Sequence, residues 1–138
     1  MVRSQSPELK NIAREALAIG DVQSAATFRV GASGALELAA AAGIEGPALD
    51  GLIAAVQHPG HPVARAVSDA GPTFDVRPMN PGGPALRSHV PLRAARDGQT
   101  LGVLALAHES PIGDADRAQV ADLAARAAEV LANGGRPL

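Results

Sequence analysis

The sequence feature that most constrains the fold is a pair of apolar runs joined by a polar link. The runs are residues 90–92 and 101–107, and the link between them contains Asp97-Gly98. Asp-Gly between apolar runs is a strong hairpin signal, because glycine accepts the positive φ that tight strand connections need. The second run is apolar on both faces, whereas an antiparallel strand with one wet face alternates with polar residues. We therefore predict a central strand at residues 101–107, covered on both sides by the rest of the chain.

Apolar periodicity and chain-breaking residues predict the remaining elements. Four helices are predicted, at residues 7–19, 47–56, 62–70 and 114–132. Four strands are predicted besides the central one: three at residues 25–31, 35–42 and 73–79, and a fourth in the first half of the hairpin. Residues 80–84 form a loop rich in proline and glycine. Ser6 is a suitable N-cap and Pro7 a suitable first residue for the first helix, and Asp114 or Asp116 caps the last one. Residues 35–42 would suit a helix by propensity, but a glycine-bearing turn joins them directly to the preceding strand, so we predict a strand there.

Composition bounds the class of protein. The 138 residues suit one domain, 1–138 with a core of about 7–132. The 12 Lys+Arg balance the 14 Asp+Glu, so there is no broad basic surface for nucleic acid or an anionic membrane. No cysteine is present, which excludes disulfides, thiolate zinc sites and thiol nucleophiles. No apolar stretch approaches the ~20 residues of a membrane span. We predict a cytoplasmic protein without nucleic-acid or membrane partners.

Four short motifs, in this order and spacing, give the chain a family resemblance. They are GHPVARAVSDAGP at residues 60–72, SHVPL at 88–92, LGVLAL at 101–106 and an acidic helix start at 114–116. Together they resemble the GAF domain, a small sensory module related to PAS domains. The resemblance extends from about Pro7 to Ala132.

The resemblance implies an α+β fold of the GAF or profilin-like kind. A five- to six-stranded antiparallel sheet would carry the terminal helices on one face and the short helices and loops, over a pocket, on the other. Such modules bind small molecules or dimerise, and pass a signal along their terminal helices. Residues 80–87, between the third and fourth strands, are too few for the extra helix that many ligand-binding members insert there.

Arginines and apolar strand residues near the presumed pocket are the candidate ligand contacts. Guanidinium groups suit carboxylate or phosphate ligands, although each arginine also fits an ordinary solvated position. Phe74 and Arg77 are the pair we would choose for an anionic ligand, but in a regular strand they face opposite sides, and only a bulge would bring both inward. The predicted ligand-binding set is Phe74, Arg77, Arg87, His89, Leu104 and Leu106.

The terminal helices carry the second candidate site. Their alanine-rich stripes permit close helix–helix approach, which serves packing within one chain or a two-fold bundle with a second copy. The resemblance favours the second copy, and one helix can do both because its stripe is wide. The predicted homodimer interface is Leu9, Ile12, Ala16, Val120, Leu123, Ala127 and Val130.

The histidines suggest a metal or haem alternative. His58 and His61 are separated by Pro59-Gly60, which indicates a loop and not one helical face, and no carboxylate pattern completes a zinc set. His89 and His108 fall in neighbouring predicted strands and could approach each other. A histidine can bind haem in GAF domains, but a haem pocket needs bulky apolar walls that a chain with two phenylalanines offers sparsely. We predict no metal and no cofactor.

Catalytic signatures are also absent from the sequence. Ser33, Ser88 and Ser110 lack a nucleophile-elbow context and a plausible Asp-His partnership. Bilin-binding and methionine-sulfoxide-reducing relatives need cysteine, and the Asn-Lys signature of cyclic-nucleotide-binding relatives is missing. We predict a non-enzymatic sensory or regulatory homodimer that could bind a small molecule and acts on an unidentified protein partner. The alternatives are a purely structural dimerisation domain and a histidine-dependent metal or haem protein.

Overall fold

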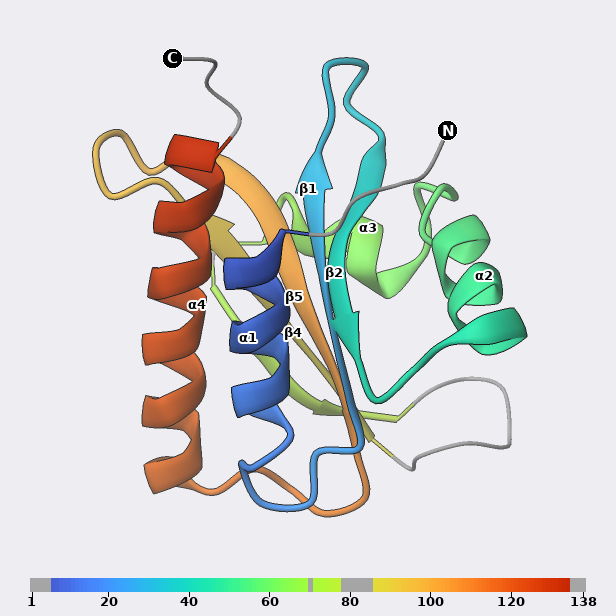
Figure 1. The fold of residues 1–138 in the computed structure, drawn as a ribbon, viewed down its shortest axis with the longest axis vertical. Helices are drawn as coiled ribbons and strands as arrows, with labels where there is room; N and C mark the ends of the chain where they lie inside the picture. Colours follow the sequence, from blue (N-terminus) through green and yellow to red (C-terminus); the bar gives the residue numbers. More distant parts are fainter. Residues whose placement is uncertain (1–5, 70, 78–85, 135–138) are drawn as a thin grey trace.

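A five-stranded antiparallel sheet forms the middle of the molecule (Figure 1). The computed structural model describes residues 6–69, 71–77 and 86–134. The sheet has the order β2-β1-β5-β4-β3, and its strands are β1 (Ser24–Val30), β2 (Leu36–Ala42), β3 (Thr73–Val76), β4 (Leu86–Arg93) and β5 (Thr100–His108). The predicted hairpin is β4 and β5. The prediction of a central strand is confirmed, because β5 is the third of the five and has β1 and β4 as neighbours.

Helices cover both faces of this sheet. The terminal helices α1 (Pro7–Ala16) and α4 (Asp114–Gly134) lie side by side on one face, and α2 (Gly46–Ala55) and α3 (Pro62–Ala66) lie toward the other (Figure 1). The predicted α+β class, element order and layering are therefore confirmed, with five strands in the described part of the chain. No helix within those residues is long and apolar enough to cross a bilayer.

Helix boundaries differ from the prediction by a few residues. Ser6 caps α1 as predicted, with its Oγ accepting from the Leu9 N–H at 3.3 Å. The helix ends at Ala16 and not at residue 19, because residues 17–19 form tighter i→i−3 hydrogen bonds. Helix α3 is likewise shorter than predicted. Residues 78–85 lie outside the described part of the chain, and so do the end of the predicted strand 73–79 and most of the interval 80–87.

The larger core lies between the sheet and the terminal helices. Apolar side chains of β1, β2, β4 and β5 meet the inner stripes of α1 and α4 there. Gly102 of β5 lets these layers approach: a Cβ at this position would lie 2.1 Å from the Phe28 carbonyl oxygen and 3.0 Å from Leu131 Cδ1. Any side chain at residue 102 would therefore push β5 away from both β1 and α4.

The alanine-rich segment is strand β2, as predicted, although its local propensity favours a helix. Pairing with β1 along its whole length supplies its hydrogen bonds, and a bulge between Thr27 and Phe28 shifts the register by one residue. Gly43 ends the strand at φ 77, where a Cβ would lie 2.2 Å from the Gln23 carbonyl oxygen. Tertiary pairing and a glycine-dependent exit thus override helix propensity.

Groups outside the sheet satisfy carbonyl oxygens of β2, which is an edge strand. The Ser6 N–H donates to the Ala39 carbonyl at 3.2 Å, and the Lys10 ammonium donates to that of Ala41. The Gln57 side-chain amide donates to the carbonyl of residue 36 at 2.8 Å. The edge of the sheet is therefore closed by α1 on one stretch and by the segment after α2 on another.

Candidate functional site

The face of the sheet under α2 and α3 has a thinner cover than the face under the terminal helices. Val63 and Ala66 of α3, and Val56 just after α2, reach the sheet and pack with Phe28 and Val103. None of the ten residues of α2 is buried, although the helix is strongly apolar. It is the one helix of the described chain that contributes no fully buried residue.

A hollow of about 480 Å³ lies at one end of this face. Its walls are the start of β2, the loop that follows α2 and the outer side of α3. Apolar side chains and backbone line most of it, and Gln57, Arg65 and Asp69 supply polar groups. The lining residues are Gly34, Ala35, Leu36, Val56, Gln57, Pro59, Ala64, Arg65, Val67, Ser68 and Asp69. A hollow of this size suits a small molecule.

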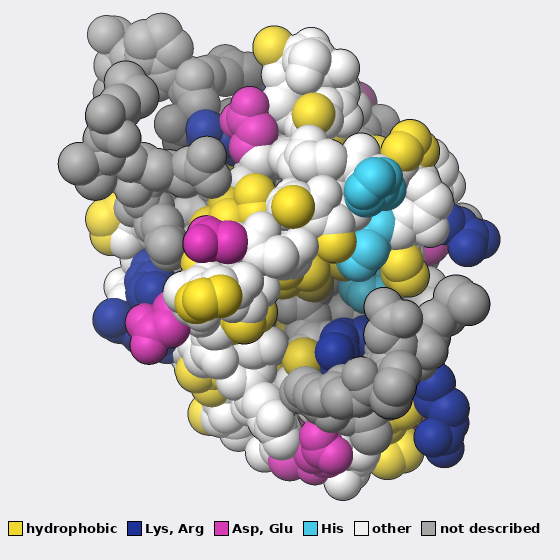
Figure 2. All heavy atoms as spheres, turned by 90° about the vertical axis from the view of Figure 1, so that its right-hand side faces the viewer, with side chains coloured by type: hydrophobic (Ala, Val, Ile, Leu, Met, Phe, Trp, Pro, Cys, Tyr) yellow, Lys and Arg dark blue, Asp and Glu magenta, His cyan; other side chains and the backbone are white. Residues whose placement is uncertain are grey.

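Figure 2 shows histidine side chains, in cyan, gathered on this face of the molecule. His58 influences the pKa of His61, and His61 that of His89, but none of the three lines the hollow. His61 caps α3, with Nδ1 accepting from the Val63 N–H at 3.1 Å, and burial together with neighbouring His58 lowers its pKa. His89 of β4 lies deeper and is 5% exposed. Burial, His61 and Arg87 lower the pKa of His89 to about 4, against the opposing effect of Asp69. His89 is therefore neutral at pH 7.

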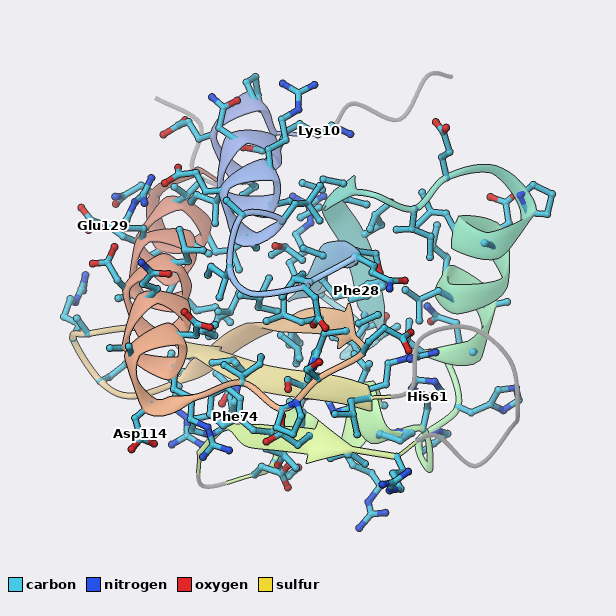
Figure 3. All side chains as sticks on the ribbon, turned by 90° about the horizontal axis from the view of Figure 1, so that it is seen from below. Lys10, Phe28, His61, Phe74, Asp114 and Glu129 are labelled. Carbon is cyan, nitrogen blue, oxygen red and sulfur yellow. The ribbon has the colours of Figure 1, made fainter. Side chains whose placement is uncertain are left out.

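The predicted ligand-binding residues divide between the two faces. His89 and Arg87 lie on the α2–α3 face, and Arg77 is exposed just after β3. Leu104 and Leu106 belong to the core under the terminal helices, and Phe74 packs against that core. This corrects the prediction for these three residues: on β5 the α2–α3 face is taken by Val103, since alternate residues point to opposite sides. Figure 3 shows Phe74 near the start of α4 and His61 well away from it.

Strand β3 contains a bulge next to Phe74. Thr73 pairs with His89 and Val76 with Arg87, so β3 has one residue more than β4 between these two pairs. Asp75 has φ 61, the one positive φ of a non-glycine residue in the described ranges. The bulge turns both Phe74 and Asp75 toward α4, where sequence alternation predicts opposite directions.

Both side chains then contact Arg117 in the first turn of α4. The guanidinium carbon of Arg117 lies 4.5 Å from the centre of the Phe74 ring. Its Nη2 donates to Asp75 Oδ2 at 2.9 Å, and its Nε donates to the carbonyl of Ile112 at 2.9 Å. Asp75 Oδ1 accepts from the Ile112 N–H at 2.9 Å. One short edge strand is thereby joined to the start of the last helix.

Ser88 and His108 form a pair that the sequence reasoning missed. Ser88 Oγ lies 2.8 Å from His108 Nε2, and His108 Nδ1 lies 2.8 Å from the carbonyl oxygen of Ser110. Because that carbonyl can only accept, the hydrogen bond to it needs a proton on Nδ1, and with the proton on Nδ1 alone Ser88 donates to Nε2. Both side chains are fully buried, so no substrate reaches them. The hairpin register, which places residues 86, 88, 106 and 108 on one face, is the signal that could have revealed the pair.

His108 also differs from its predicted relation to His89. The two residues lie on neighbouring strands, but His108 points to the terminal-helix face and His89 to the α2–α3 face. They therefore cannot approach each other. Within the described ranges, no group of three or more His, Cys, Asp or Glu residues could hold a metal ion.

The predicted dimer interface is occupied by the chain's own core. Six of its seven members are buried between the terminal helices and the sheet, and the seventh, Val130, packs beside them. The buried ones are Leu9, Ile12, Ala16, Val120, Leu123 and Ala127. This corrects the prediction, because a wide apolar stripe is consumed within one chain. The outward surface of α4 carries Ala118, Ala121, Asp122, Ala125 and Arg126, and Arg126 makes a two-pronged ion pair with Glu15 of α1 at 2.7 and 3.0 Å.

A family model described as the GAF domain matches residues 7–131. The chain therefore belongs to the GAF family, as its motifs suggested. GAF domains are commonly sensory or regulatory parts of signalling proteins. No curated protein matches the sequence.

Solved structures agree with this assignment at the level of the fold. The GAF domain of an Acinetobacter phosphoenolpyruvate-protein phosphotransferase has a TM-score of 0.69 and 15% identity, over 94% of this chain and 85% of that one. The GAF-B domain of DevS from Mycobacterium smegmatis has a TM-score of 0.65 and 18% identity, over 91% of each chain. A type II free methionine-R-sulfoxide reductase from Thermoplasma acidophilum has a TM-score of 0.70 and 15% identity, over 89% of each chain. One fold thus carries both regulatory and enzymatic relatives.

Proposed function

We propose that this GAF domain is a non-enzymatic sensory or regulatory module that binds a small molecule in the hollow bounded by the start of β2, the loop after α2, and α3. The observation that carries the proposal is the unequal cover of the two faces. The core between the sheet and the terminal helices is continuous, and the hollows of about 540 and 590 Å³ between α1 and α4 are lined mostly by exposed residues. The α2–α3 face has an apolar helix without a buried residue and a hollow of about 480 Å³. A ligand seated in this hollow would bury apolar groups that line it, such as those of Ala35, Ala64 and Val67.

A non-enzymatic function is favoured over the chemistry of the reductase relative. This chain has no cysteine, so it cannot supply a thiol to reduce a sulfoxide. The one serine–histidine pair of the described residues is fully buried. The cytoplasmic location and the protein partner expected from the sequence are part of the same proposal.

Native mass spectrometry tests ligand binding directly. The protein is purified untagged from its own cells, or from a close expression host, and its mass is compared with that of the bare chain. Extra mass in the wild-type spectrum would show a bound molecule. Its loss in Ala64→Trp would support the proposed site, because Ala64 lines the hollow. Ala54→Trp, on the exposed side of α2, is the matched control and should retain the mass. A bare spectrum in every preparation would favour the purely structural alternative.

We further propose that two copies associate through the outward side of α4. The small exposed residues Ala118, Ala121 and Ala125 allow close approach of a second helix, flanked by Asp122 and Arg126 of opposite charge. Light scattering coupled to size exclusion should report a dimer. Ala125→Arg should give a monomer, whereas Ala95→Arg in the β4–β5 turn should not. A monomeric wild-type protein at high concentration would contradict this part of the proposal.

A further inference from the structure

The β3 bulge lies between two layers of the molecule, the terminal helices on one face of the sheet and α3 on the other. On one side, Phe74 and Asp75 reach α4 through Arg117. On the other, the chain enters β3 directly from α3, with residues 67–72 as the whole connection. Because the strand is four residues long, a displacement at its start reaches the bulge within one or two residues.

On the α3 side, β3 is linked to that short helix through β4. Thr73 pairs with His89 of β4, the strand on which α3 packs, and His61 and Asp69 at the two ends of α3 influence the pKa of His89. The carbonyl of Asp69 accepts from the guanidinium of Arg93 on β4. Movement of α3 relative to the sheet therefore changes the surroundings of Thr73 before those of any other β3 residue.

On the α4 side, Asp75 is the centre of a polar network. Its N–H donates to Ser88 Oγ at 3.1 Å, and its carboxylate accepts from Arg117 and from the Ile112 N–H. Ser88 is held in turn by His108. A non-glycine residue at positive φ costs free energy, and the surrounding hydrogen bonds hold Asp75 in that conformation. Loosening these bonds would therefore allow Asp75 to leave the positive φ.

We propose that the β3 bulge is a coupling element that makes the order of the first turn of α4 depend on the position of α3. With α3 seated on the sheet, Asp75 holds Arg117 and Ile112 and fixes the start of α4. With α3 displaced, the bulge relaxes, these contacts are lost, and the first turn of α4 opens locally. The coupling gives the proposed sensory function a route from one face to the other, but it is a property of the chain alone and its test needs no ligand.

The test compares two equivalent truncations on the α2–α3 face. Val63→Ala loosens α3, and Val56→Ala removes the same groups from a valine that is also 2% exposed in the same cluster but leads into the loop before α3. Amide hydrogen exchange is followed by NMR at Arg117 and Ala118 in the first turns of α4, with amides of β1 and the end of α4 as references. Both truncations are repeated in Asp75→Gly, which accepts the positive φ but lacks the carboxylate.

The proposal expects Val63→Ala to accelerate exchange at Arg117 and Ala118 by about five-fold or more relative to the reference amides. Val56→Ala should leave this ratio unchanged. In Asp75→Gly the first turn should already exchange fast, and Val63→Ala should add nothing. Equal acceleration at all amides, equal effects of the two truncations, or the same effect of Val63→Ala with and without Asp75 would each overturn the coupling. If Val63→Ala does not fold, Ala64→Gly weakens the same helix at a partly exposed position and has the same outcomes.

Discussion

The two faces of the sheet are built to different standards of packing. Under α1 and α4, twenty buried residues form one continuous core. Under α2 and α3, the buried cluster has nine residues, and most of the apolar side chains of α2 are only partly covered. Eight partly buried apolar residues of the described chain pack against this cluster, among them Ile44, Leu49, Leu52 and Ile53. This difference indicates that the terminal-helix face supplies most of the stability of the fold. The α2–α3 face keeps apolar surface that can still be buried.

The largest expected effect comes from truncating one leucine on each face of the sheet and comparing the losses of stability. Leu9→Ala in α1 removes a side chain that is 2% exposed and should lower the free energy of unfolding by about 3 kcal/mol. Leu52→Ala in α2 removes a partly exposed side chain and should cost less than about 1 kcal/mol. Urea unfolding followed by circular dichroism measures both. Equal losses would show that α2 is packed as firmly as α1.

Acid should weaken the α2–α3 face through His89. Its pKa in the folded protein is about 4, below the ordinary value of 6.5, so between these values the unfolded chain binds more protons. The contribution of neutral His89 is fully present above about pH 6.5 and decreases as the pH falls toward 4, by up to about 3 kcal/mol. Urea midpoints at pH 7, 6, 5 and 4 should therefore fall less in His89→Gln than in wild type. The exposed His58, changed to Gln, is the control and should leave the wild-type slope in place.

A smaller effect of opposite sign is expected on the well-packed face. Thr27 is fully buried, and its hydroxyl has no hydrogen-bond partner among the described residues. Thr27→Val keeps the shape and removes the unpaired hydroxyl, so it should raise the free energy of unfolding by about 1 kcal/mol. Thr100→Val, at a partly exposed position, should change stability less. Destabilisation by Thr27→Val would mean that the hydroxyl contributes an interaction in solution.

The smallest effect should come from the ion pair on the outer surface of the terminal helices. Arg126 and Glu15 are both about half exposed, so water and salt screen their attraction. Arg126→Gln should lower the unfolding midpoint by less than Thr27→Val raises it, and the difference should vanish as sodium chloride is added. An effect that persists at high salt would show that the pair is part of the packing between α1 and α4.

The order of elements and the central strand could be predicted because they depend on local patterns. Alternation, the Asp97-Gly98 link and proline or glycine at the breaks are readable without a structure. The assignment of side chains to faces could be predicted only where strands are regular. Leu104 and Leu106 were correctly placed on one side of β5, but which helices cover that side is a long-range property that no local pattern contains.

The candidate site was harder to predict from the sequence than the fold, because it too depends on long-range contacts. Phe74 was chosen as a ligand contact because its strand lies near the short helices, and the choice did not establish which face of the sheet its ring is on. The bulge at Asp75 depends on hydrogen bonds to residues 112 and 117, far along the chain, so no local pattern reveals it. His89 was placed correctly in the first strand of the hairpin, whereas Arg87, expected in the interval before that strand, is the second residue of β4. The lining of the hollow, drawn from β2, the segment after α2 and α3, depends on how three separate elements meet. Sequence periodicity gives each element but not the space between them.

The closed edge at β2 has a consequence for how this domain can polymerise. A growing fibril recruits a new chain by pairing its backbone with a vacant rim of the template. Ser6, Lys10 and Gln57 already occupy acceptors along that rim, so an incoming chain would first have to displace them. A concentrated solution of the folded protein should accordingly resist seeding. Removing Lys10 and Gln57 together should shorten the lag time before thioflavin-positive aggregates form, even where the melting temperature barely changes.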